Sequence, residues 1–172
     1  MKQKVILWLT TILALGTVSA MVIHKETIIK DGTLMLLQLA PVDPRSIIQG
    51  DYMTLRYTLA NQVRSAVKQN EKNGIAVVSL TPAGVAKFIR IHEESKPLEP
   101  NEHLLKFRKR SFQVRFAAEA WFFQEGHAAD FSKTRYGELR VSDTGEAVLT
   151  GMRDKQFKSL RHVFKKPASA SQ

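Results

Sequence analysis

An uncharged apolar run near the N-terminus constrains this chain more than any other feature of its sequence. The run extends from Val5 to Ile23 and holds 19 residues. Because a helix rises about 1.5 Å per residue, the run would span roughly 28 Å, which matches the hydrocarbon core of a bilayer. Lys2 and Lys4 precede it. Since positive residues stay in the cytoplasm, the sequence predicts one transmembrane helix, with residues 24 onward outside the cytoplasm.

A cleavable signal peptide is the alternative interpretation of the same segment. Val18-Ser19-Ala20 has the small side chains of a cleavage site. The apolar run nevertheless continues through Met21-Val22-Ile23, and His24-Lys25 follow it as an interfacial stop. These residues favour an uncleaved anchor, while cleavage after Ala20 stays open. Both interpretations place the domain outside the cytoplasm, which argues against nucleic acid as a partner.

The remaining residues have the composition of one folded domain. The chain has 172 residues, of which 44% are hydrophobic and 24% charged, as in ordinary globular proteins. Cysteine is absent, so disulfides and thiol catalysis are excluded. We expect an anchor at 1–25, an extracytoplasmic domain at 26–164 and a disordered tail at 165–172. The net charge of +10 favours anionic neighbours, and lipid is the nearest one for a tethered domain.

Alternating apolar residues and turn signals predict several hairpins. A short polar connection at 26–32 leads to a buried strand at 33–40, and an alternating strand at 51–59 runs into a helix. The predicted hairpins pair 75–80 with 85–91, 104–110 with 112–116, and 136–141 with 146–152. This order predicts an α+β domain, mainly antiparallel β, built as a curled sheet or small barrel of hairpins with one or two short helices.

The segment from Gly50 to Tyr57 reads G-D-Y-x-x-L-x-Y. Three flanking segments extend the pattern, namely Leu39 to Ser46, Phe122 to His127, and Arg135 to Val141. Together they resemble the GDYXXLXY family of bacterial membrane-anchored proteins over roughly residues 26–160. The resemblance implies a single-pass protein of the bacterial cytoplasmic (inner) membrane, with its domain in the periplasm or outside. Members are frequently encoded beside multi-pass membrane proteins, which implies an integral membrane partner.

The resemblance carries no established activity, so it assigns no catalytic residue. The motif residues are Gly50, Asp51, Tyr52, Leu55 and Tyr57. A structural role is favoured for Gly50, Asp51 and Tyr52, because a catalytic aspartate needs a paired group and the spacing places none. We name further candidates for ligand or partner contacts: Asp43, Arg45, Glu125, His127 and Tyr136. The histidines lack zincin spacing and no Asp-x-Asp loop is present, so we expect neither a metal nor a cofactor.

A basic segment forms the other candidate site. The basic patch consists of Lys106, Arg108, Lys109, Arg110 and Arg115, interleaved with Phe107, Phe112 and Phe116. Such a pattern is typical of single-stranded nucleic-acid binding, but strand alternation also produces it, with phenylalanines inward and basic residues outward. The predicted location favours anionic lipid or an acidic partner. In Trp121-Phe122-Phe123, three consecutive rings cannot share one strand face, so one exposed ring is predicted.

Three functional hypotheses follow from these features. The leading one is a non-catalytic, membrane-tethered accessory domain that binds an integral membrane protein. The second is a ligand-binding or hydrolytic domain in which Asp51, Tyr52, Glu125 and His127 converge on one pocket. The third is binding of anionic lipid through the basic hairpin.

Overall fold

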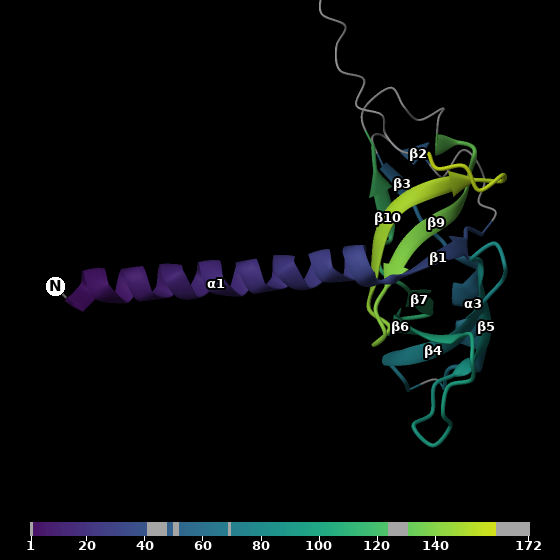
Figure 1. Ribbon diagram of the computed structural model, residues 1–172, viewed down its shortest axis with the longest axis horizontal. Coiled ribbons are helices and arrows are strands. Elements are labelled where there is room, and N and C mark those ends of the chain that lie inside the picture. Colours follow the sequence, from purple (N-terminus) through teal and green to yellow (C-terminus); the bar gives the residue numbers. More distant parts are fainter. Residues whose placement is uncertain (1, 41–47, 50–51, 69, 124–130, 161–172) are drawn as a thin grey trace, which may run out of the picture.

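A long helix projects from a small β-rich domain (Figure 1). The computed structural model describes residues 2–40, 48–49, 52–68, 70–123 and 131–160. Helix α1 (Lys2–Asp31) includes the segment Ile6–Asp31, which is long and apolar enough to cross a membrane. The prediction of a polar connection at 26–32 is wrong, because α1 continues to Asp31. Ile28 explains the extension, since it is only 3% exposed and packs on the domain.

The domain consists of three antiparallel sheets and a second described helix, α3 (Thr58–Ala66). The first sheet has the order β1 (Thr33–Gln38), β9 (Thr134–Val141) and β10 (Ala147–Asp154). The second has the order β2 (Ile48–Gln49), β3 (Tyr52–Thr54) and β8 (Ala120–Phe122). The third has the order β5 (Ala86–Ile91), β4 (Asn73–Leu80), β6 (Glu102–Arg110) and β7 (Gln113–Arg115). The predicted fold class, α+β with mainly antiparallel, curled β structure, is therefore confirmed.

One hydrophobic cluster joins the sheets and α3. Leu37 and Leu139 enter it from the first sheet, and Val78 and Leu105 enter it from the third. Helix α3 adds Leu59 and Val63, which lie four residues apart and so share one helix face. The helix ends at Ala66, because Val67 is already extended. The helix that the sequence predicts after the alternating strand is therefore confirmed.

All three predicted hairpins are present. Strand β4 pairs with β5, β6 with β7, and β9 with β10. Phe107 and Phe116 point inward as expected, but Phe112 is 80% exposed. The prediction that Phe112 points inward is wrong, because this residue lies in the two-residue turn between Arg110 and Gln113. Ser111 in the same turn has a φ of 55°. A turn residue is outside the two-residue alternation of a strand.

The alternating segment that contains the motif forms less strand than predicted. Strand β3 covers only Tyr52–Thr54, and the chain reaches α3 after an isolated bridge at Tyr57. The burial alternation still holds from Tyr52 to Leu59, with Met53, Leu55 and Tyr57 in the core. The exposed ring predicted in residues 121–123 is Phe122, which is 74% exposed. The tail expected at 165–172 lies outside the described residues.

Candidate functional site

Charged side chains fasten the end of α1 to the turn between β9 and β10. The Nε2 atom of His24 lies 2.9 Å from Oε2 of Glu146, and Lys25 Nζ donates to the same oxygen at 3.3 Å. Lys106 Nζ lies 3.8 Å from the other carboxylate oxygen. The hydrogen bonds with His24 and then Lys25 lower the pKa of Glu146 from its ordinary value of 4.5. One carboxylate thus connects α1, β6 and the β9–β10 turn.

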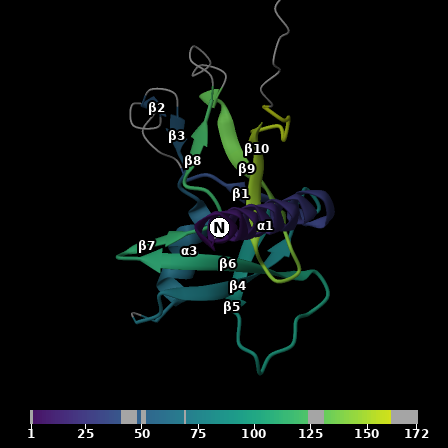
Figure 2. The same cartoon turned by 90° about the vertical axis from the view of Figure 1, so that its left-hand side faces the viewer.

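A second set of contacts holds α1 at its last turn. Arg140 Nη1 donates to the carbonyl oxygen of Gly32 at 2.9 Å. The backbone of Val141 passes so close to Gly32 that an added Cβ would meet its N and O atoms at 3.0 Å. Ile28 is buried beside these contacts. Helix α1 is therefore held against the domain by side-chain and backbone contacts, mainly with β9 and β10. Figure 2 shows the helix with its N-terminus toward the viewer, in front of the sheets.

A basic groove lies at this base and has a volume of about 960 Å³. Its basic residues are Lys25, Lys106, Arg108, Arg110 and Arg115. Two carboxylates, Glu119 and Glu146, also line it, and Arg115 Nη1 lies 2.8 Å from Glu119 Oε2. Four of the five residues of the predicted basic patch thus gather in one groove. Lys25 is a member of the groove that the sequence pattern did not indicate, although it lies just after the apolar run.

Lys109 is the member of the predicted patch that does not line the groove. Its Nζ donates to the carbonyl oxygen of Lys68 at 2.9 Å. Strand periodicity explains the difference, because Lys106, Arg108 and Arg110 alternate along β6 and share one face, while Lys109 lies on the other.

An apolar concavity of about 540 Å³ lies beside the groove and shares Lys25 with it. Ala118, Ala120, Phe122 and Leu149 contribute to its lining. The exposed Phe122 ring is supported by the motif residue Tyr52, whose ring centroid is 5.8 Å away. We call this surface the aromatic concavity.

Two other motif residues belong to the core. Leu55 and Tyr57 are buried, and the Tyr57 hydroxyl donates to the carbonyl oxygen of Ala118 at 3.4 Å. Burial raises the pKa of Tyr57, so its hydroxyl stays protonated. Gly137 lies against the ring, where an added Cβ would be 3.1 Å from Cε1. Leu55 and Tyr57 therefore position the chain between β3 and α3, whereas Gly50 and Asp51 lie outside the described residues.

The motif also forms the floor of a cleft of about 540 Å³ between α3 and β7. Leu55, Tyr57 and Phe116 provide the apolar floor, and Arg56 and Arg64 line the cleft as well. These residue types suit an anion that carries an apolar group. The cleft lies apart from Tyr136, which packs its ring on Phe157 at a centroid distance of 5.0 Å.

The segment around Tyr136 has a structural feature of its own. Glu138 is only 6% exposed, and Arg153 Nε donates to its Oε2 at 2.6 Å. The other predicted contact residues, Asp43, Arg45, Glu125 and His127, lie outside the described residues. Asp51 does as well, so the convergence of Asp51, Tyr52, Glu125 and His127 on one pocket stays a prediction. Within the described part of the chain, no group of three or more His, Cys, Asp or Glu side chains is arranged to hold a metal ion.

Comparison with known proteins gives one finding. The sequence model of the GDYXXLXY protein family matches residues 14–152, which include most of α1 and nearly all of the described domain. No curated protein and no solved structure matches the chain. The match covers the motif, the aromatic concavity and the basic groove together, and the chain therefore belongs to the GDYXXLXY protein family.

Proposed function

We propose that this protein is a single-pass protein of the bacterial cytoplasmic membrane whose extracytoplasmic domain binds an integral membrane partner without catalysing a reaction. The observation that carries the proposal is the set of contacts at the junction between α1 and the domain. Glu146 holds His24 and Lys25, and Arg140 holds Gly32. These contacts favour one orientation of the domain relative to the helix, which would direct one face of the domain toward a membrane neighbour.

The position of the aromatic concavity supports this role. If residues 5–23 lie in the hydrocarbon core, His24 and Lys25 lie at the level of the lipid headgroups. Lys25 lines the aromatic concavity, so Phe122 lies close to the membrane surface. Large exposed aromatic rings in shallow apolar surfaces are frequent anchors of protein interfaces. An integral membrane protein beside α1 would meet this ring first.

Photocrosslinking in intact cells tests the partner. A photoreactive amino acid replaces Phe122 in one variant and Ile89 in a matched control. Ile89 is also an exposed apolar residue, but it lies on β5. We expect position 122 to capture one membrane protein and position 89 to capture none. Capture of the chain alone, or identical products from both positions, would contradict the proposal.

The orientation in the membrane has its own test. Alkaline phosphatase is active only outside the cytoplasm, so a fusion after Gln172 should be active in cells. A fusion of a cytosol-dependent fluorescent protein at the same position should remain dark. The reverse pair of results would place the domain in the cytoplasm and remove the proposed location.

A further inference from the structure

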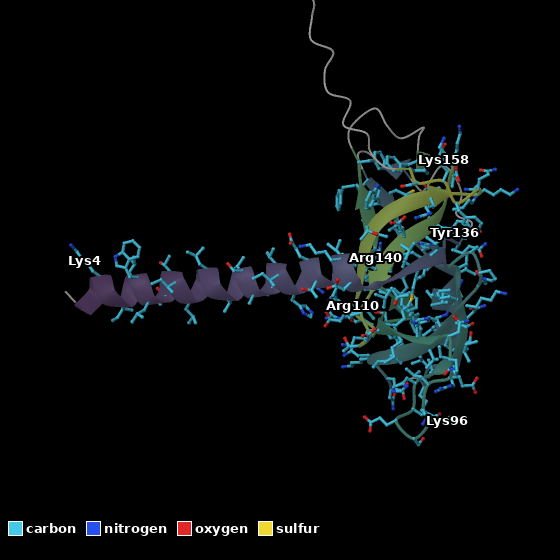
Figure 3. The ribbon with its side chains drawn as sticks, in the orientation of Figure 1. Lys4, Lys96, Arg110, Tyr136, Arg140 and Lys158 are labelled. Carbon is cyan, nitrogen blue, oxygen red and sulfur yellow. The ribbon has the colours of Figure 1, made fainter. Side chains whose placement is uncertain are left out.

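The basic groove lies at the height where α1 leaves the membrane in the proposed arrangement. Lys25 lines the groove, and it follows Ile23, the last residue of the uncharged run, by two positions. Arg110 lies on the side of the domain from which α1 projects (Figure 3). We infer that the groove binds the phosphate headgroups of anionic phospholipids. This inference rests on the proposed membrane placement of α1.

The charges of the groove favour an anion. Five basic side chains and two carboxylates line it, which leaves a net charge of +3. Glu119 is paired with Arg115, and Glu146 is shared by His24, Lys25 and Lys106. Within the described part of the chain, Arg108 and Arg110 form no ion pair with a carboxylate. Their guanidinium groups remain available as planar, multiply donating ligands for phosphate oxygens.

The exposure of the phenylalanines interleaved with the basic patch favours lipid over nucleic acid as the anion that binds the groove. Binding of single-stranded nucleic acid needs exposed rings on which bases stack. Phe107 and Phe116 are 2% and 1% exposed, so they provide no such platform. Phe112 is exposed, and it lies in the turn next to the strand that carries Arg110. Of the three phenylalanines interleaved with the basic patch, only Phe112 is exposed. An exposed aromatic ring beside cationic side chains suits the headgroup region of a bilayer, where both are favoured.

Lipid retention by the full chain tests this inference. The protein is reconstituted in liposomes of equal phosphatidylcholine and phosphatidylglycerol, and extracted in mild detergent. The retained lipids are then counted by mass spectrometry. We expect phosphatidylglycerol to be enriched over the bulk ratio by about fivefold, since each basic residue near an anionic surface adds a modest attraction. The double variant Arg108→Gln/Arg110→Gln should bring the ratio close to that of the bulk lipid.

A matched variant removes the same charge elsewhere. Lys87 and Lys158 are exposed and lie outside the groove, and Lys87→Gln/Lys158→Gln should retain the wild-type enrichment. Equal loss in both variants would show a general charge effect and overturn the site. Unchanged enrichment in the arginine variant would overturn it as well. A third result would also overturn the site: the arginine variant loses the crosslink from position 122 but retains the same lipids. The groove would then be a protein contact.

Flotation of the same liposomes separates this inference from the proposed function. If the full chain fails to float with liposomes of phosphatidylcholine alone, α1 does not insert and the membrane placement fails. If the chain floats with neutral and with mixed liposomes but retains no excess of phosphatidylglycerol, the placement stands and the headgroup site is wrong. Equal melting temperatures of the variants in detergent verify that each lipid ratio comes from a folded protein.

Discussion

Glu138 and Arg153 show how one buried charge depends on a single neighbour. Glu138 is buried in the first sheet, and Arg153 Nε and the Thr150 hydroxyl both donate to its carboxylate. Replacing Arg153 with Met leaves this carboxylate without its cation. Because an uncompensated buried charge is costly, we expect Arg153→Met to lower the free energy of unfolding by about 3 kcal/mol.

Melting in mild detergent, followed by circular dichroism, measures this effect. The double variant Glu138→Met/Arg153→Met should recover most of the lost stability, because an apolar pair of similar volume replaces the ion pair. Arg135→Met is the control, since Arg135 is exposed on β9. A double variant as unstable as the single variant would show that packing, and not the unpaired charge, causes the loss.

Gly137 tests whether the motif tyrosine is a structural residue. An added Cβ would lie 3.1 Å from Tyr57 Cε1 and 3.4 Å from Leu149 Cδ1. Since Tyr57 is buried and precedes α3, its ring has little room to move, and Gly137→Ala should lower the free energy of unfolding by about 1–3 kcal/mol. Gly151→Ala is the matched control, because its Cβ would meet only atoms at 3.9 Å or beyond. Equal melting temperatures for both variants would contradict this structural role.

At the scale of elements, the junction of α1 includes one titrating carboxylate, Glu146. The folded-state pKa of Glu146 lies below its ordinary value of 4.5. Its contribution is therefore present above pH 4.5 and is lost as the pH falls through the lowered pKa. Spin labels on Glu26→Cys and Asp143→Cys measure the distance across the junction. No other site is labelled, because the native chain has no cysteine.

The distance distribution between the two labels should be narrow at pH 7 and broaden as the pH drops well below 4.5. Glu146→Gln should broaden it already at pH 7 and remove its dependence on acid. Asp154→Gln is the control, because this carboxylate lies at the other end of β10. A wild-type distribution that stays narrow throughout would show that Ile28 and Arg140 hold the helix without Glu146.

The sequence predicted the hairpins well because their information is local. Apolar β-rich runs and a turn signal define β4–β5 and β9–β10 within about twenty residues each, and a short turn defines β6–β7 in the same way. The alternation of side chains along a strand also explains why Lys109 lies on the other face of β6 from Arg108 and Arg110. The sequence did not predict the extension of α1 to Asp31, because the contacts of α1 are with β9 and β10, far along the chain. The same long-range contact brings Lys25 into the basic groove, so composition alone could not complete that site.

At the scale of the whole molecule, the junction of α1 connects the membrane placement to both proposed interactions. A flexible linker at this point would leave the sheets, α3 and the core unchanged. It would, however, allow the domain to rotate relative to α1. The crosslink from position 122 and the lipid enrichment at Arg108 and Arg110 both need a domain held against the membrane surface, so both should weaken when the domain rotates freely.

Insertion of Gly-Ser-Gly-Ser between Asp31 and Gly32 tests this dependence. We expect the crosslink from position 122 to fall several-fold, because many orientations now compete with the productive one. The same four residues inserted between Lys96 and Pro97, in the exposed loop between β5 and β6, control for the insertion itself. That control should crosslink as strongly as the wild type and melt at the same temperature. If the junction insertion also leaves the crosslink unchanged, a partner must orient the domain, and the continuity of α1 with the β sheets would have no role in recognition.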